Sequence, residues 1–250
     1  MKLSIIVPAF NEARTIAALL DAVRAVDLGG LGLEREILVV SDGSTDGSAA
    51  IARAQAGVAV HEYHPNRGKG AAVRHGLAHA SGDLILIQDA DLEYDPQDYL
   101  ALLPPLCDGR AQVVYGSRLL GYQKQFGKGT VRRHPGAYRS AYLGGRAVTA
   151  FTNLLYGTHL TDAPTCYKCF RADLLRALTI EHERFDWEQE VTAKIVRSGI
   201  EIFEVPISYR PRSFREGKKI GVRDGLAALW TLARYRTWRP NRAFSGPRRA

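Results

Sequence analysis

The sequence predicts an α/β fold in which a mostly parallel sheet carries helices on both faces. Two observations support this fold class. Short apolar segments alternate with amphipathic segments of helical period through the first half of the chain. Several of the apolar segments are continuous runs, which is typical of parallel strands that helices cover on both sides.

The expected elements of the first half follow from this periodicity. Strands are expected where short apolar runs occur, over residues 3–7, 36–40, 58–63, 83–87 and 112–115. Helices are expected where polar capping residues or glycine precede amphipathic segments, over residues 11–25, 44–56, 68–80 and 96–107. Strand and helix therefore alternate as in a series of βα units.

The regular alternation breaks near residue 117. Residues 117–140 contain six basic side chains, four glycines and no acidic side chain, so a mobile basic loop is expected there. Beyond it, helices are expected over residues 137–156, 186–198 and 221–236, with a strand over residues 201–205. Gly199 directly follows the second of these helices and favours its end.

The charge and the cysteines restrict the classes of protein. The net charge of +8 is concentrated after residue 205, where the segment carries +10 and the rest of the chain −2. Because no basic patch interleaved with aromatic side chains accompanies this charge, a membrane surface or an anionic acceptor explains it at least as well as nucleic acid does. No run of ~18 apolar residues and no signal peptide is visible. With three cysteines, these features predict a cytoplasmic protein, with peripheral contact at the inner face of the membrane as an option.

Two carboxylates follow the apolar strand at residues 83–87. Asp89 and Asp91 are two residues apart at the end of this strand, the edge at which open α/β sheets bind ligands. Hard oxygen ligands at that edge suit Mg²⁺ or Mn²⁺ bound together with substrate phosphates. A solvated turn that caps the next helix is the alternative interpretation of this short motif.

Other strand ends add polar groups to the same edge. Asp42 follows the second strand, where a carboxylate can accept hydrogen bonds from a base or ribose. Ser44 and Asp46 could instead cap the helix that follows. The segment Asn66-Arg67-Gly68-Lys69-Gly70 opens the third helix, where free amides and cations could meet an anion. The chain lacks both G-x-G-x-x-G after the first strand and a P-loop motif, which argues against NAD enzymes and P-loop NTPases.

Four of these segments together resemble family 2 glycosyltransferases of the GT-A fold. They come in order at residues 4–12, 40–47, 66–70 and 88–91. The segments at residues 115–118 and 204–207 narrow the resemblance to dolichol-phosphate mannose synthase and related polyprenyl-phosphate glycosyltransferases. The resemblance implies a Rossmann-like sheet, a nucleoside-diphosphate sugar donor, a divalent metal and an inverting transfer of a hexose to a polyprenyl phosphate.

The resemblance also implies roles for individual residues. Binding of the nucleotide sugar is expected at Pro8, Phe10, Glu12, Asp42, Ser44, Lys69, Gln88, Asp89 and Ala90. The expected metal ligands are Asp89, Asp91 and Glu93. Glu93 stands where mannose synthases often carry Gln. The expected catalytic residues are Asp91, Arg118, Arg212 and Lys218, and the expected acceptor contacts are Arg132, Arg133, Asp186 and Glu188.

The resemblance further implies a division of the chain. Residues 1–220 are expected to form the catalytic domain, with basic loops at about 117–140 and 210–220 near the acceptor. Residues 221–250 are expected to form an amphipathic helix and a basic tail. On that helix the apolar residues that share one face are Val222, Leu226, Leu229, Trp230 and Ala233. The helix is expected to pack on its own domain, although its basic flanks also suit a membrane interface.

Several alternatives stay open at this point. The donor could be a GDP or a UDP hexose, and the hexose mannose or glucose. A soluble or polysaccharide hydroxyl acceptor would need a general base, for which Asp186, Glu188 and Glu190 are available. A nucleic-acid-binding protein and a catalytically silent nucleotide-binding subunit are rival hypotheses. The Cys166–Cys169 pair and the seven histidines are not expected to bind metal, because no second cysteine pair exists and the histidines are read as scattered without ligand spacing.

Overall fold

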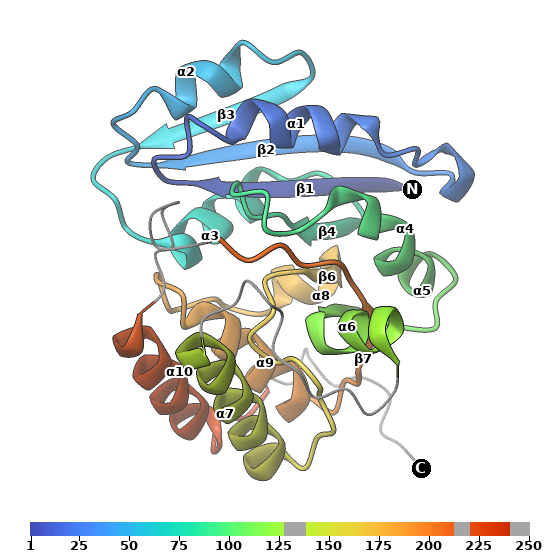
Figure 1. Ribbon diagram of the computed structural model, residues 1–250, viewed down its shortest axis with the longest axis vertical. Coiled ribbons are helices and arrows are strands. Elements are labelled where there is room, and N and C mark those ends of the chain that lie inside the picture. The colour runs from blue at the N-terminus through green and yellow to red at the C-terminus, as the bar shows by residue number, and fades with distance from the viewer. Residues whose placement is uncertain (128–138, 213–220, 241–250) are drawn as a thin grey trace.

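A single mixed sheet with helices on both faces organises the molecule (Figure 1). The computed structural model describes residues 1–127, 139–212 and 221–240. In these ranges the sheet has seven strands in the order β3-β2-β1-β4-β6-β5-β7. Their bounds are β1 Lys2–Ala9, β2 Glu34–Asp42, β3 Val58–Tyr63, β4 Leu84–Ile87, β5 Val113–Ser117, β6 Lys168–Arg171 and β7 Ile202–Pro206. The predicted fold class is confirmed.

The directions of the strands bring most of their carboxyl ends to one edge. β1 pairs in parallel with β2 and β4, and β2 pairs in parallel with β3. β6 is antiparallel to β4 and to β5, while β5 is parallel to β7. Because two reversals restore the original direction, every described strand except β6 ends at the same edge of the sheet. Loops from widely separated parts of the chain therefore meet there.

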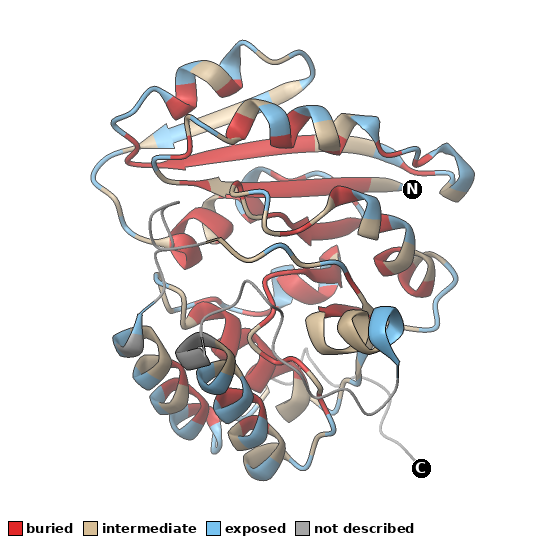
Figure 2. Ribbon diagram, in the orientation of Figure 1, coloured by how far each residue is buried: buried red, intermediate tan, exposed pale blue. Residues whose placement is uncertain are grey.

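Helices cover both faces of this sheet and enclose two apolar cores (Figure 2). Leu3, Ile5 and Val7 of β1 pack into one core, and Ile6 packs into the other, as the twofold alternation along a strand requires. The helices are α1 Ile16–Ala25, α2 Ser48–Arg53, α3 Lys69–His79, α4 Tyr99–Leu102, α5 Pro104–Cys107, α6 Arg118–Phe126, α7 Arg139–Tyr156, α8 Ala172–Ala177, α9 Trp187–Arg197 and α10 Val222–Tyr235, with 3-10 turns η1 Gly29–Leu31 and η2 Pro96–Asp98.

The predicted loop over residues 117–140 is wrong for its first part, which forms α6. The Ser117 hydroxyl oxygen accepts a hydrogen bond from the backbone N–H of Leu120 at 3.1 Å and caps this helix. Gly121 then lets α6 lie against the end of β7, because a Cβ at this position would lie 1.8 Å from the carbonyl oxygen of Ile207. The glycine that suggested a loop thus serves a close contact between two elements. Residues 128–138 of the expected loop lie outside the described residues.

β6 and α8 are missing from the expected elements. β6 has four residues and begins with Lys168, which is fully buried although lysine is rarely found inside. The Lys168 ammonium donates to the carbonyl oxygen of Ala163 at 2.9 Å and lies 3.8 Å from the ring centroid of Tyr115. Burial lowers the pKa of this lysine to about 8. A strand this short with a buried cation has no apolar pattern to predict it.

α10 packs on the rest of the described chain through a different face from the one that its sequence suggests. Ala228 and Leu232 of α10 are buried against Val148 of α7. Leu226 and Trp230, expected on the apolar face, are 64% and 67% exposed. Ala228, Leu232 and Tyr235 are buried where α10 meets α7 and α9, and Leu229 of the expected face also packs against the apolar cluster there. Among the described helices, none has the length and hydropathy that a membrane crossing needs.

Candidate active site

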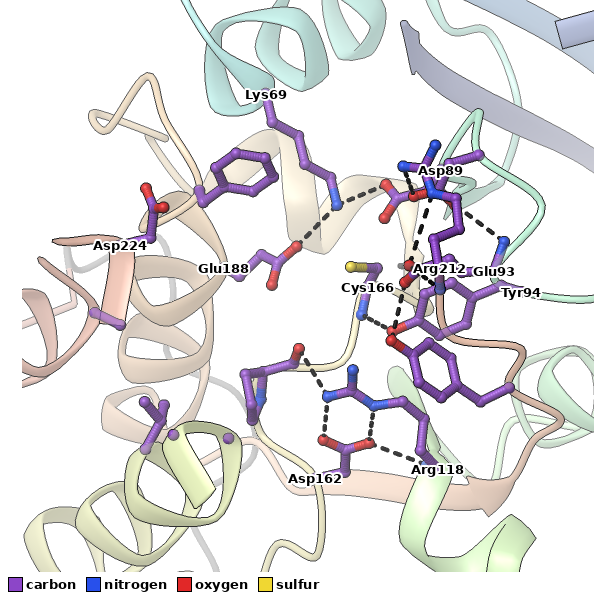
Figure 3. A pocket seen from close by; sticks show the side chains of 18 of the residues that line it. Lys69, Asp89, Glu93, Tyr94, Arg118, Asp162, Cys166, Glu188, Arg212 and Asp224 are labelled. Carbon is purple, nitrogen blue, oxygen red and sulfur yellow. Dashed lines mark hydrogen bonds and ion pairs between the residues drawn. The ribbon is translucent and has the colours of Figure 1, made fainter. Parts of the chain in front are cut away.

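A cavity of about 1360 Å³ lies at the edge where the strands end. The end of β2 and the loops after β1, β3, β4 and β7 contribute to its lining, together with α3, α6, α7, α9 and α10. Figure 3 shows charged side chains from these elements pointing into one space. The residues expected to bind a nucleotide sugar that do line the cavity are Pro8, Phe10, Glu12, Asp42, Lys69, Asp89 and Ala90.

Asp42 organises one end of the cavity. Its carboxylate accepts hydrogen bonds from the backbone N–H groups of Arg67 and Gly68, both at 2.7 Å, and from the amide of Asn66 at 2.8 Å. The turn at residues 66–68 is thereby held against the end of β2. Gly43 has φ of +71°, and a Cβ there would lie 2.5 Å from the backbone nitrogen of Asn66. The close approach of these two segments therefore requires glycine.

Asp89 lies beside a buried lysine from another element. The Lys69 ammonium at the start of α3 lies 2.6 Å from Asp89 and 2.9 Å from Glu188 of α9 (Figure 3). Burial favours the neutral form of Asp89, but the charges of Lys69 and Arg212 and a hydrogen bond with Cys166 together outweigh it and lower the pKa of the carboxyl. Attraction to Asp89 and Glu188 likewise overcomes the opposing effect of burial and raises the pKa of Lys69. Asp89 and Lys69 are therefore both charged at neutral pH.

Asp91 is held by an arginine from the chain beyond β7. The Arg212 guanidinium lies 2.6 Å from Asp91 and 3.3 Å from Glu12. Burial raises the pKa of Asp91, and the nearby charges of Asp89 and Glu93 raise it further. A high concentration of negative charge is thus built into the end of β4, and cations from two distant segments offset it.

Hard oxygen donors of this kind fit Mg²⁺ or Mn²⁺. Asp89 and Asp91 both line the cavity, and the mutual repulsion that raises the pKa of Asp91 is what a divalent cation relieves. Glu93 also lines the cavity, but its carboxylate accepts hydrogen bonds from the Tyr209 hydroxyl at 2.9 Å and from the Arg212 backbone N–H at 2.8 Å. The metal roles of Asp89, Asp91 and Glu93 all stay predictions.

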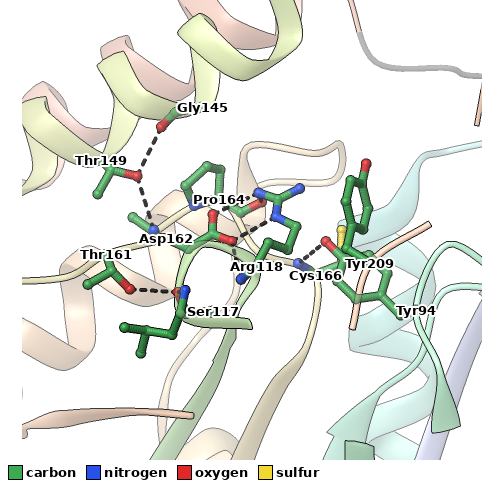
Figure 4. A network of polar contacts seen from close by, with 12 residues as sticks. Tyr94, Ser117, Arg118, Gly145, Thr149, Thr161, Asp162, Pro164, Cys166 and Tyr209 are labelled. Carbon is green, nitrogen blue, oxygen red and sulfur yellow. Dashed lines mark hydrogen bonds and ion pairs between the residues drawn. The ribbon is translucent and has the colours of Figure 1, made fainter. Parts of the chain in front are cut away.

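Arg118 at the start of α6 lines the cavity. A network of polar contacts surrounds its guanidinium (Figure 4). Its guanidinium donates to both carboxylate oxygens of Asp162, each at 2.7 Å, and to the carbonyl oxygen of Pro164 at 3.2 Å. Its central carbon lies 5.1 Å from the ring centroid of Tyr209. Attraction to Asp162 overcomes burial and raises the pKa of Arg118. The expected contact of Arg118 with substrate phosphates stays a prediction.

Other expected site residues have different places in the structure. Ser44 contacts the backbone of Ala9 and Asn11, and Gln88 is fully buried and accepts hydrogen bonds from two tyrosine hydroxyls. Asp186 pairs with His182 at the start of α9. These three side chains are not among those that line the cavity, whereas Glu188 is. Arg132, Arg133 and Lys218 lie outside the described residues.

Several lining residues carry no signal in the sequence. Asp162 and Tyr209 lie in irregular segments, and both line the cavity and contact Arg118. Tyr94 is buried, and its hydroxyl oxygen accepts a hydrogen bond from the Cys166 backbone N–H at 3.2 Å. Burial, together with the charge of Asp89, raises the pKa of the Cys166 thiol, so this cysteine is protonated. Turn-forming residues around Asp162 are the only local cue to that segment.

A mostly parallel sheet with a charged cavity at its carboxyl edge defines a Rossmann-like α/β enzyme. Residues 4–179 match the family model described as Glycosyl transferase family 2. The chain belongs to this family and is a glycosyltransferase, as the resemblance predicts.

Proteins that are similar over most of this chain are also named as glycosyltransferases or sugar transferases. The undecaprenyl-phosphate mannosyltransferase of Micrococcus luteus is 30% identical, with 94% of this chain and 99% of that protein covered. The undecaprenyl-phosphate 4-deoxy-4-formamido-L-arabinose transferase of Edwardsiella ictaluri is 27% identical, with 97% and 70% covered. The crystal structure of glucosyl-3-phosphoglycerate synthase from Mycobacterium tuberculosis, in complex with Mn²⁺, uridine diphosphate and phosphoglyceric acid, superposes with a TM-score of 0.69 at 21% identity, covering 96% of this chain and 80% of that chain. This last likeness shows that the GT-A fold is shared.

Proposed function

We propose that the protein transfers a hexose, mannose or glucose, from a nucleoside-diphosphate sugar to a polyprenyl phosphate with inversion at the anomeric carbon. The observation that carries the proposal is the pair Asp89 and Asp91, held in the cavity at the end of β4 beside Lys69 and Arg212. Relatives that are named for transfer to undecaprenyl phosphate support this choice of acceptor.

In this proposal the donor lies along the carboxyl edge of the sheet. Pro8, Phe10, Glu12 and Asp42 bind the nucleoside, since they line the end of the cavity formed by β1 and β2. Asp89 and Asp91 hold Mg²⁺ or Mn²⁺, which when bound offsets the charge of the departing diphosphate. Arg212 lies beside Glu12, which follows β1, and Asp91, which follows β4. It contributes positive charge next to the departing diphosphate.

The acceptor phosphate needs no general base in this proposal. A lipid phosphate is anionic at neutral pH and can attack the anomeric carbon in line with the departing diphosphate. Glu188 lines the cavity, but its carboxylate pairs with the Lys69 ammonium at 2.9 Å. This pairing favours a role for Glu188 in positioning Lys69. For a hydroxyl acceptor, Glu188 is the carboxylate that could accept the proton.

A membrane-facing surface supports a lipid acceptor. The cavity extends to Tyr142 and Arg146 of α7 and to Leu226 of α10, two helices that pack side by side (Figure 1). Their exposed large apolar side chains are Leu143, Leu154, Leu226 and Trp230, which we call the helix-pair surface. Arg146, Arg223 and Arg234 are exposed on the same helices. Apolar and basic side chains together suit the interface of an anionic membrane.

The proposal is tested by supplying radiolabelled GDP-mannose, UDP-glucose or related donors with undecaprenyl phosphate and Mg²⁺ or Mn²⁺. Product that is extractable into organic solvent, and that depends on the metal, is expected with one donor. Asp91→Asn is expected to lower turnover at least about a hundredfold, because a metal ligand contributes several kcal/mol to the transition state. Asp108→Asn changes an exposed carboxylate and is expected to retain activity.

Other outcomes of this assay would overturn parts of the proposal. Labelled product that stays in the aqueous phase would point to a hydroxyl acceptor. Turnover that Asp91→Asn leaves intact would remove this residue from the metal site. Lack of turnover with every donor, combined with nucleotide binding detected by thermal stabilisation, would favour a silent nucleotide-binding subunit.

A further inference from the structure

Three histidines gather between β3 and α3, apart from the residues that line the cavity. His61 lies on β3, and His75 and His79 lie one turn apart on α3. One ring nitrogen from each lies within 4.8 Å of those of the other two. The ring centroids are 5.3 Å apart for His61 and His75, 4.1 Å for His61 and His79, and 4.6 Å for His75 and His79. The expectation that the histidines are scattered is therefore wrong for these three.

The secondary structure explains why the three rings meet. Residues four apart on a helix lie on the same face, so His75 and His79 project in the same direction. β3 is the edge strand of the sheet, and α3 follows it after the turn at residues 64–68. His61 on β3 therefore meets the helical pair from the opposite side. Sequence spacing shows the i, i+4 pair alone, and the third ring is added only by the packing of α3 beside β3.

The ring contacts of His79 leave one of its nitrogens to a metal. A neutral imidazole binds metal through the nitrogen that carries no proton. His79 Nδ1 lies 2.9 Å from the carbonyl oxygen of His75. A proton on Nδ1 makes this contact a hydrogen bond and leaves Nε2 as the ligand atom, an arrangement common among metal-binding histidines.

We propose that His61, His75 and His79 form a binding site for a divalent transition metal such as Zn²⁺, separate from the carboxylates at Asp89 and Asp91. Three imidazole ligands suit Zn²⁺, Ni²⁺ or Cu²⁺ and do not suit Mg²⁺. Because His79 is exposed, water completes the coordination from the solvent side. The metal joins β3 to α3 and so stabilises the turn between them, which supplies the donors to Asp42.

The test uses the full chain after removal of metals, in buffer with excess Mg²⁺ to occupy the hard oxygen ligands. Zn²⁺ is then titrated while calorimetry records the stoichiometry, and NMR records the histidine ring signals. One Zn²⁺ per chain is expected, with shifts at His61, His75 and His79 and an increase in thermal midpoint. His79→Ala is expected to weaken binding at least about tenfold, since it removes one of three ligands.

The variants are chosen so that loss of folding cannot be mistaken for loss of the site. His79 is exposed, so its replacement leaves the core intact, and His61→Ala provides a second test from the other element. His159→Ala removes an exposed histidine outside the cluster and is expected to bind Zn²⁺ as the unchanged chain does. Equal affinity in His79→Ala and the unchanged chain would overturn the proposal. Loss of the Zn²⁺ site in Asp91→Asn but not in His61→Ala would overturn it as well.

Discussion

At the scale of single residues, Lys69 links the two halves of the candidate site. Its ammonium lies between Asp89 from the end of β4 and Glu188 from α9, and all three side chains are largely removed from solvent. A buried charge is tolerated when its partners neutralise it, and removal of one partner leaves the others uncompensated. Lys69 therefore supports the folded state as well as the charge balance of the cavity.

Lys69→Met is expected to lower the free energy of unfolding by about 3–5 kcal/mol, because it leaves two buried carboxylates close together without a cation. Urea denaturation measures this change. Lys124→Met replaces an exposed lysine on α6 and is expected to change stability by no more than about 0.5 kcal/mol. If Lys69→Met lowers the free energy of unfolding by less than about 1 kcal/mol, the charges of Asp89 and Glu188 do not depend on Lys69 for compensation.

At the scale of elements, two contacts decide how strands and helices are joined around the sheet. α6 lies against the end of β7 because Gly121 has no side chain. At the edge where the parallel strands begin, Glu36 of β2 accepts hydrogen bonds from Ser4, Ser81 and Lys2. It thereby joins β1, β2 and the loop before β4. Each contact depends on one residue and can be tested separately.

Gly121→Ala is expected to destabilise the protein by at least about 2 kcal/mol, since its Cβ would overlap the Ile207 carbonyl and force α6 away from β7. Thermal unfolding measures the loss. Gly144→Ala on α7 is the matched control, because a Cβ there meets no atom within 4 Å. This control is expected to gain up to about 1 kcal/mol from helix propensity. Similar effects of the two substitutions would contradict the close contact of α6 with β7.

Glu36 gives the fold a dependence on pH at the acidic end. Burial by itself raises the pKa of this carboxyl, but hydrogen bonds from Ser4, Ser81 and Lys2 outweigh it and lower the pKa to about 2. The folded state thus binds a proton less readily than the unfolded chain. The stabilisation is present above the ordinary value of 4.5 and is lost as the pH falls through about 2.

Glu36→Gln is therefore expected to be less stable than the unchanged chain near pH 6, with the difference shrinking between pH 4.5 and pH 2. Urea unfolding over this pH range measures the difference. Glu34→Gln alters an exposed carboxylate on the same strand and is expected to follow the unchanged chain. A difference that stays constant down to pH 2 would rule out the ionised carboxylate as its source.

At the scale of the whole molecule, the cavity and the helix-pair surface lie next to each other. α7 and α10 contribute both to the lining of the cavity and to the exposed apolar side chains. Under the proposed function, this placement lets the phosphate of a lipid acceptor enter the cavity while its hydrocarbon chain stays in the membrane. This arrangement predicts that membrane binding and lipid-linked turnover depend on the same two helices.

The double variant Leu226→Gln, Trp230→Gln is expected to bind vesicles of phosphatidylglycerol and phosphatidylcholine several-fold more weakly, because it removes apolar area from the interface. Sedimentation with the vesicles measures the bound fraction. Leu100→Gln on α4 is the matched control, since Leu100 is also exposed but lies outside the helix-pair surface. Equal loss in both variants, or no loss in either, would exclude this surface as the membrane contact.

The sequence by itself determined the α/β class, the approximate positions of the parallel strands and the family. Continuous apolar runs fix buried strands, and strand ends place Asp42, Asp89 and Asp91 at one edge, because parallel strands share a direction. These inferences need only local periodicity and short motifs. The first five strands, the helix at residues 187–197 and the final helix were predictable for the same reason.

Only the tertiary structure decided which side chains face one another. The ion pairs of Lys69 with Glu188 and of Arg212 with Asp91 join residues more than a hundred positions apart. Their spacing in the sequence carries no trace of the contact. The antiparallel β6, the close approach at Gly121 and the meeting of His61 with His75 and His79 arise in the same way. Each depends on long-range packing, which brings together residues that are far apart in the sequence and that no local pattern connects.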